Sequence, residues 1–146
     1  MNLQYRIGTR VINLVWKLLF GYKVIGRENV PKKGAFIIAS NHLSNFDPPL
    51  VGTAVWTRES FFFAKKGLFI ENKFFAWLIK TYNAFPVDTK KRVDPQALRK
   101  AEKVLQRRQA LLMFPEGTRS RTGEFLPPQE GIAFLAIRNR VPILPV

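Results

Sequence analysis

The sequence contains no cysteine among its 146 residues and only one histidine. The absence of cysteine excludes a disulfide-stabilised scaffold, a thiol nucleophile and any metal site with thiolate ligands. A single histidine leaves too few nitrogen ligands for a zinc site built by the protein. We therefore expect no metal ion and no thiol chemistry.

Acidic residues are also scarce, with 10 Asp and Glu against 24 Lys and Arg and a formal net charge of +14. This excess indicates an anionic partner, which is a phosphate-bearing ligand, a lipid surface or a nucleic acid. The aromatic residues are mainly phenylalanines (13 Phe, 3 Trp and 3 Tyr) and lie mostly within apolar runs. Binding of single-stranded nucleic acid uses exposed aromatics among basic residues, so we expect no nucleic-acid partner.

No apolar run is long enough to span a bilayer, which takes about 20 residues. The longest, at residues 11–22, is interrupted by a lysine. Written as a helix, residues 1–22 place one polar stripe on an otherwise apolar surface, formed by Arg6, Arg10, Asn13 and Lys17. This pattern predicts an amphipathic helix that lies in a membrane interface. The alternative is a helix that packs on the core of the domain.

Beyond Gly26 the pattern alternates between strands and helices. Short apolar runs predict strands at 35–39, 61–64, 84–87, 110–114 and 141–146, and helical spacing lies between them at 47–55, 73–82, 94–107 and 131–138. The fold class is therefore α/β, with a mainly parallel sheet covered by helices on both faces. We expect residues 23–146 to form one domain. Because the chain ends within an apolar strand, we also expect that the natural protein continues and that this domain is truncated at its C-terminus.

The loop after the first predicted strand contains the only histidine, His42, five residues before Asp47. A carboxylate that accepts from one imidazole nitrogen fixes the tautomer and leaves the other nitrogen as a base. The pair Asp47-Pro48 also predicts a helix start, with Asp47 as the N-cap. The alternative is that Asp47 is only a cap and His42 an ordinary loop residue.

The loop after the strand at 110–114 is rich in glycine, hydroxyl and arginine residues at positions 115–123. Arginine suits phosphate because its guanidinium donates two parallel hydrogen bonds. The loop could therefore hold an anion, although a solvated surface loop has the same composition. A third basic stretch, residues 90–92, is expected to be solvated or to contact lipid headgroups.

Taken together, His42–x4–Asp47 and the stretch 114–120 (Phe-Pro-Glu-Gly-Thr-Arg-Ser) resemble the glycerolipid acyltransferase family. Within that family the chain is most similar to the 1-acyl-glycerol-3-phosphate (lysophosphatidic acid) acyltransferases. Two further blocks, 84–88 and 141–146, fit in order and spacing. The sequence departs from the family pattern at Asn83, where a glycine is usual, and at Thr89 and Glu130, where basic residues are common.

The resemblance implies a role for each matching residue. His42 would be the general base and Asp47 its orienting partner. Glu116, Gly117, Thr118 and Arg119 would bind the glycerol-phosphate end of the acceptor. The blocks at 85–87 and 141–146 would shape the substrate site.

The resemblance also implies the reaction, which is transfer of a fatty acyl group to the free hydroxyl of lysophosphatidic acid, giving phosphatidic acid for phospholipid synthesis. The thioester donor, acyl-CoA or acyl carrier protein, is a cosubstrate, and no cofactor is expected. The enzyme would be membrane-associated, with its active site on the cytoplasmic face. Two alternatives are an acyltransferase for another lysolipid and a non-enzymatic basic module that binds membranes. A serine hydrolase would need a G-x-S-x-G motif, which the sequence lacks.

Overall fold

A computed structural model describes residues 3–90 and 94–146, so part of the basic stretch at 90–92 lies outside the described residues. Five strands form one sheet in the order β3-β2-β4-β1-β5, and every neighbouring pair is parallel. The strands are β1 Phe36–Ala39, β2 Ser60–Lys65, β3 Ala84–Val87, β4 Ala110–Met113 and β5 Ile143–Pro145. The helices are α1 Leu3–Phe20, α2 Asp47–Ala54, α3 Lys73–Thr81, α4 Pro95–Gln106 and α5 Gly131–Asn139, with 3₁₀ turns at Arg27–Asn29 and Lys66–Phe69. The predicted α/β class is confirmed.

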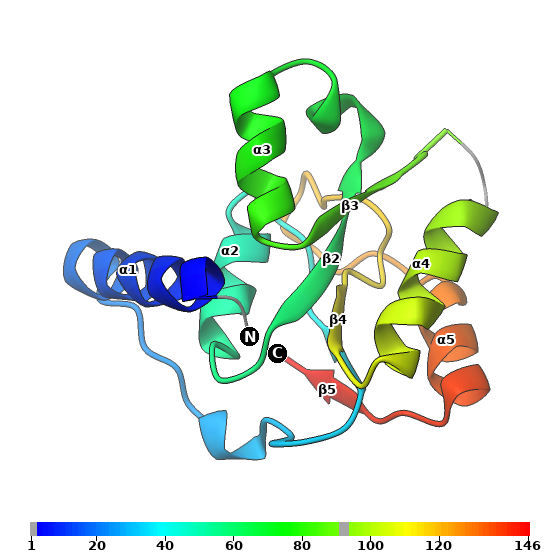
Figure 1. The fold of residues 1–146 in the computed structure, drawn as a ribbon, viewed down its shortest axis with the longest axis horizontal. Helices are drawn as coiled ribbons and strands as arrows, with labels where there is room; N and C mark the ends of the chain where they lie inside the picture. The colour runs from blue at the N-terminus through cyan, green and yellow to red at the C-terminus, as the bar shows by residue number, and fades with distance from the viewer. Residues whose placement is uncertain (1–2, 91–93) are drawn as a thin grey trace.

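The two faces of the sheet bury different sets of side chains, because successive residues of a strand point to opposite sides. On one face, Ile37 and Leu111 pack against residues of α4 and α5 such as Ala101 and Leu135. On the other face, Phe36 and Ile38 pack with Val51 of α2 and others. Figure 1 shows α2 on one side of the sheet and α4 and α5 on the other. Helices therefore cover both faces, as the sequence predicts.

The element ends follow local signals in the sequence. Asp94 caps α4 by accepting hydrogen bonds from the backbone amides of Gln96 and Ala97, and Asn72 caps α3 in the same way through the amide of Phe75. The last strand is shorter than its apolar run, since proline has no amide hydrogen to donate. The carbonyl of Pro142 nevertheless accepts from the amide of Ile37 at 2.9 Å. The edge position of β5 tolerates such prolines.

Helix α1 lies against α2 and extends away from the sheet (Figure 1). It is attached by Tyr5, whose buried hydroxyl lies 2.9 Å from Ser60 Oγ and accepts from the amide of Ser60. The opposite face of α1 is exposed and apolar, and is formed by Leu3, Ile7, Val11, Leu14, Val15 and Leu18. One face therefore packs on the domain, while most of the apolar surface is uncovered. None of the helices within the described ranges has the length and apolar content needed to cross a bilayer.

Candidate active site

The two unusual loops meet because β1 and β4 are parallel neighbours in the sheet, with Ala39 beside Met113. Their carboxyl ends therefore lie at the same edge, where ligand sites of α/β sheets form. The loop at 40–46 leads from β1 to α2, and the loop at 114–130 leads from β4 to α5. The backbone amide of Ser40 donates to the carbonyl of Met113 at 3.3 Å, which continues the ladder into the loops.

His42 and Asp47 form the predicted dyad. His42 Nδ1 lies 2.8 Å from Asp47 Oδ2, and both side chains are largely but not fully buried. With Nδ1 donating to the carboxylate, the neutral imidazole has its lone pair on Nε2. The ring is also stacked on Phe114, with centroids 4.0 Å apart and planes at 16°. The contacts with Asp47 and Phe114 therefore hold the ring in one orientation, and the lone pair of Nε2 can accept a proton.

The structure corrects the expectation that Asp47 is the N-cap of α2. Phe46 is the cap residue, and Asp47 is the first residue of the helix. Its Oδ2 accepts from the backbone amides of Leu43 and Ser44, both at 2.7 Å, rather than from amides of the helix. The carboxylate turns toward the loop because the tight bend before α2 brings His42 and these amides together. It therefore closes the loop and orients the histidine at once.

The pKa of the Asp47 carboxyl is lowered from its usual value by these contacts. Partial burial raises the pKa, but the hydrogen bonds from the Ser44 amide, the His42 side chain and the Leu43 amide outweigh it. Hydrogen bonds to the charged form favour that form. Asp47 is therefore an anion at neutral pH, ready to stabilise a protonated His42.

Glu116 joins the two loops. Its side chain is buried, and Oε1 accepts from the backbone amide of His42 at 2.9 Å while Oε2 accepts from that of Leu126 at 3.1 Å. The carbonyl of His42 accepts in turn from the amide of Ser120 at 2.8 Å. Both backbone groups of the catalytic candidate are thus held by the second loop.

The other three predicted acceptor residues lie in the same loop and are exposed: Gly117, Thr118 and Arg119. Gly117 has φ +70°, and a Cβ at this position would come 3.3 Å from Gln129 Cγ. A side chain would therefore be strained there. Arg119 has no ion-pair partner in the described part of the chain, so its guanidinium is available to a ligand.

Residue type and spacing do not indicate the stacking and backbone contacts of the site, although Phe114 and Ser120 belong to the stretch 114–120 that carries the family resemblance. Phe114 stacks on His42 but reads as the last apolar residue of a strand. Ser120 is buried and accepts from the amide of Gly123, and its spacing to that glycine could have predicted a turn. The amides of Leu43 and Ser44 have no side-chain signature at all.

No group of three or more His, Cys, Asp or Glu side chains placed to hold a metal occurs within residues 3–90 and 94–146.

Comparison with known proteins identifies relatives of this chain. A family model described as Acyltransferase matches residues 21–146. The chain is 30% identical over 141 residues to the 1-acyl-sn-glycerol-3-phosphate acyltransferase of Bacillus subtilis, covering 97% of this chain and 69% of the relative. It is 36% identical over 146 residues to the enzyme of that name from Saccharomyces cerevisiae, covering 96% and 47%.

A solved structure is also similar, namely the crystal structure of the 1-acyl-sn-glycerophosphate (LPA) acyltransferase PlsC from Thermotoga maritima. The TM-score is 0.76 at 31% identity, over 97% of this chain and 56% of that one. The chain thus spans about half the length of the yeast and Thermotoga relatives. The family match includes both loops of the site, and the chain belongs to the acyltransferase family.

Proposed function

We infer that this chain is an acyltransferase that moves a fatty acyl group from a thioester to the free hydroxyl of 1-acyl-glycerol-3-phosphate, giving phosphatidic acid. The observation that carries the proposal is the dyad, in which Asp47 fixes Nδ1 of His42 at 2.8 Å and Nε2 remains as a base. The names of the relatives from Bacillus, yeast and Thermotoga support lysophosphatidic acid as the acceptor. Acyl-CoA or acyl carrier protein is the proposed donor.

The proposed step begins when Nε2 of His42 takes the proton of the acceptor hydroxyl. The hydroxyl oxygen attacks the thioester carbonyl carbon, so a C–O bond forms and the C–S bond then breaks. The proton passes from His42 to the leaving thiolate, which departs as a free thiol. Asp47 stabilises the imidazolium between these events. Because a thioester is already activated, no covalent enzyme intermediate is needed, and a positioned base contributes about 10²–10⁴-fold.

We assign different roles to the residues of the second loop. Glu116 is a positioning residue, because both of its oxygens accept from backbone amides and one of these belongs to His42. Arg119 is the phosphate ligand of the acceptor, since it is exposed in the same loop and a guanidinium pairs well with a phosphate monoester. Gly117 and Thr118 complete the exposed turn against which the glycerol-phosphate end lies.

We propose that α1 lies in a membrane interface. Its exposed apolar face, which includes Ile7, Val11 and Leu18, points away from the domain. This arrangement presents the apolar face to the acyl region of a bilayer while the domain remains in water. The cytoplasmic leaflet carries a negative surface potential, which suits a chain of net charge +14. We therefore place the active site on the cytoplasmic face.

The function is tested by mixing the chain with oleoyl-CoA and a panel of acceptors, and following the release of free thiol. Lysophosphatidic acid is expected to be used best, ahead of lysophosphatidylcholine, lysophosphatidylglycerol and glycerol-3-phosphate. Faster transfer to another lysolipid would reassign the acceptor, and release of thiol without any acceptor would indicate a hydrolase. A second series with acyl carrier protein as donor identifies the thioester.

Two variants connect that activity to the dyad. His42→Ala is expected to lower kcat by about 10²–10⁴-fold. Asp47→Asn is expected to lower kcat strongly while the KM of the acceptor changes little, because Asp47 acts on the imidazolium. Glu124→Gln, an exposed carboxyl in the second loop, is the matched control. Near wild-type turnover in His42→Ala would remove His42 as the base.

A further inference from the structure

A basic cleft lies between α1 and the segment that follows it, outside the active site. Its first part has a volume of about 300 Å³ and is lined by Arg10, Asn13, Leu14, Lys17, Arg27 and Trp56. It continues into a second hollow of about 360 Å³, which shares Asn13, Lys17 and Arg27 and adds Lys23. The two hollows form one cleft along the polar stripe of α1.

The charge in this cleft is of one sign. Arg10, Lys17, Lys23 and Arg27 line it, and none of the described lining residues is acidic. The guanidinium carbons of Arg10 and Arg27 lie over the same ring, 5.0 and 5.8 Å from the centroid of Trp56. Two like charges gathered around one ring repel each other, so an anion bound near both of them is stabilising.

Asn13, one of the residues that line the cleft, carries a buried donor without a partner. Asn13 Nδ2 is buried and makes no hydrogen bond within the described part of the chain, and a buried polar group left unpaired costs free energy. Arg27 is fixed in place, because its Nε donates to the carbonyl of Ala54 at the end of α2. The guanidinium groups of Arg10 and Arg27 and the ammonium groups of Lys17 and Lys23 form a set that suits phosphate oxygens.

We propose that this cleft is a binding site for a phosphate ester, separate from the acceptor site. Trp56 and Arg27 lie at the carboxyl end of α2, whereas His42 and Asp47 lie at its amino end. An eight-residue helix is about 12 Å long, so one phosphate cannot occupy both places. The site therefore does not serve the transfer step directly.

The position of the cleft on α1 identifies the source of the phosphate. The polar stripe lies along the edge of the exposed apolar face, since Arg10 and Lys17 flank Leu14 in the helix. If that face enters the acyl region, the cleft opens at the depth of the headgroups, and a membrane phospholipid supplies the phosphate. This step rests on the membrane association proposed above, while the phosphate chemistry of the cleft does not.

Trp56 provides a direct reporter of occupancy. In the full chain with Trp16→Phe and Trp77→Phe, Trp56 is the only tryptophan, and its fluorescence is titrated with inorganic phosphate and with dihexanoyl phosphatidic acid below its micelle concentration. Both titrations are expected to saturate, with the lipid binding more tightly. Dihexanoyl phosphatidylcholine is expected to bind at least about tenfold more weakly, because its choline cation meets the same basic groups. Calorimetry on the chain with all three tryptophans repeats the measurement without these substitutions.

Charge-matched variants separate a site from general attraction. Arg10→Gln with Lys17→Gln is expected to weaken binding by about tenfold or more, since charge-assisted hydrogen bonds are lost. Arg99→Gln with Arg107→Gln removes the same charge from exposed positions at α4, on the other side of the sheet, and is expected to change binding less than about twofold, because exposed distant charges are screened. Arg119→Ala is expected to leave the Trp56 response unchanged.

Each result decides the proposal. Saturation by the phosphatidic acid supports a site for a membrane phospholipid. Saturation by inorganic phosphate alone supports a phosphate site whose source is free phosphate. Absence of saturation, equal weakening in the two double variants, or loss of the response in Arg119→Ala would overturn it. These titrations contain no acyl donor, so a chain that transfers no acyl group but retains the cleft response rejects the proposed function alone.

Discussion

At the scale of single residues, one carboxylate oxygen of Asp47 organises the reactive end of the site. Oδ2 accepts from the imidazole of His42 and from two backbone amides. Burial raises the pKa of the carboxyl, but the hydrogen bonds from the three donors outweigh this effect and lower it. The same contacts that close the loop therefore keep the anion that a protonated histidine needs.

This lowered pKa predicts how Asp47 contributes to stability as pH changes. Its pKa in the folded state lies below the usual 3.8, so the unfolded state binds a proton first as pH falls. The stabilisation by Asp47 is complete above about pH 5 and is lost as pH falls through the folded-state pKa. Urea unfolding of the wild type and Asp47→Asn from pH 7 to pH 3 is expected to show a difference in unfolding free energy that shrinks below about pH 4. A difference that grows on acidification would contradict this.

The exposed position of Arg119 in the second loop predicts that a change at this residue weakens acceptor binding without removing the catalytic base. Arg119→Ala is expected to raise the KM of lysophosphatidic acid by about one to two orders of magnitude, because charge-assisted hydrogen bonds to phosphate are lost. Arg119→Lys is expected to recover part of this, since an ammonium cannot make the paired contact. The KM of the acyl donor is expected to change much less.

The control for this prediction is Arg121→Ala, which removes an exposed arginine two residues further along the same loop. If Arg119→Ala lowers turnover or stability and leaves the acceptor KM unchanged, the phosphate ligand lies elsewhere. Lys65 and Lys66, which are exposed at the end of β2, are then the next candidates.

At the scale of elements, the loop after β4 acts as a clamp on the loop after β1. Glu116 and Ser120 hold the amide and carbonyl of His42, and the amide of Gln129 donates to the carbonyl of Pro115 at 2.8 Å. The clamp spans 74 residues of sequence between His42 and Glu116. The position of Nε2 therefore depends on both loops.

Glu116→Gln tests the clamp, because a glutamine presents an NH₂ group where one of the two amides needs an acceptor. The free energy of unfolding is expected to fall by about 1–3 kcal/mol, and kcat is expected to fall while the KM of the acyl donor stays nearly constant. Thermal unfolding and thiol release measure the two effects. Glu124→Gln again serves as the control. A change in acceptor KM alone, with wild-type kcat and stability, would make Glu116 a ligand of the acceptor.

The exposed apolar face of α1 predicts that the chain binds membranes through this face. Trp16 is half-buried and packs on Phe46 and Phe20, whereas Leu18 and Val11 are exposed. Val11→Ser with Leu18→Ser is expected to weaken vesicle binding by about tenfold or more, because each buried aliphatic side chain contributes about 1.5–3 kcal/mol. Ile137→Ser, an exposed change on α5, is the control in vesicle co-sedimentation. Equal effects of the two changes would remove α1 as the membrane contact.

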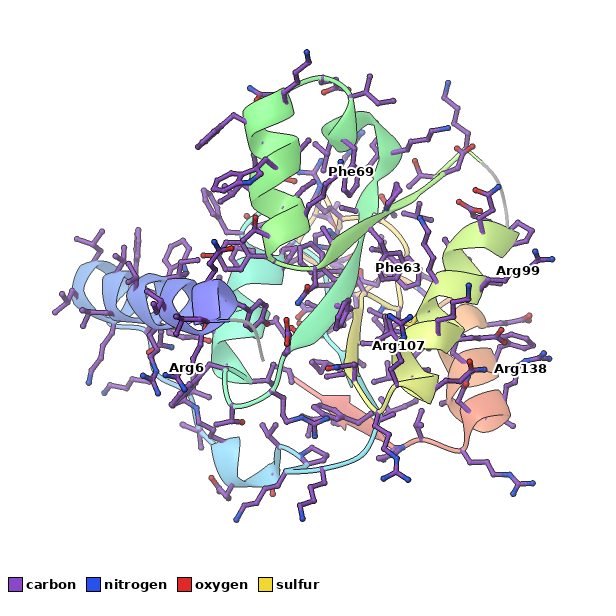
Figure 2. All side chains as sticks on the ribbon, in the orientation of Figure 1. Arg6, Phe63, Phe69, Arg99, Arg107 and Arg138 are labelled. Carbon is purple, nitrogen blue, oxygen red and sulfur yellow. The ribbon has the colours of Figure 1, made fainter. Side chains whose placement is uncertain are left out.

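At the scale of the whole molecule, the positive charge surrounds the fold. Figure 2 shows Arg6 beside α1 and α2, and Arg99 and Arg138 on the opposite side of the molecule. Part of this charge is paired, since Arg138 forms an ion pair with Glu102 at 2.6 Å. We therefore expect a general attraction to anionic membranes from charge spread over the surface, together with an apolar contact from the exposed face of α1.

This division predicts a two-part response to salt. Binding to vesicles that contain anionic lipid is expected to weaken as salt rises, since the screening length falls from about 10 Å at 0.1 M to about 3 Å at 1 M. Binding to neutral vesicles is expected to be weaker and nearly independent of salt, because it depends on apolar burial. Titration of both vesicle types from low to high salt measures the two contributions. Strong salt dependence with neutral vesicles would contradict the division.

Local signals in the sequence determine most of the elements. Apolar runs of strand length become β1 and β4, which are buried, and Asp94-Pro95 begins α4 with the expected cap. The His42–Asp47 spacing predicts a contact that needs only one turn of chain, and the structure contains it. Such features depend on neighbours in sequence, so residue type and spacing are enough to predict them.

Only the tertiary structure decides the contacts between distant segments. The strand order places β4 beside β1, and this brings Glu116 to the backbone of His42. The tertiary structure also decides that Asn83 adopts φ +64°, where the family pattern usually has glycine. Asn83 is held there by a hydrogen bond from its side chain to Glu59. These outcomes depend on backbone groups and packing partners far apart in the chain, and backbone amides have the same chemistry at nearly every residue, so no sequence pattern records them.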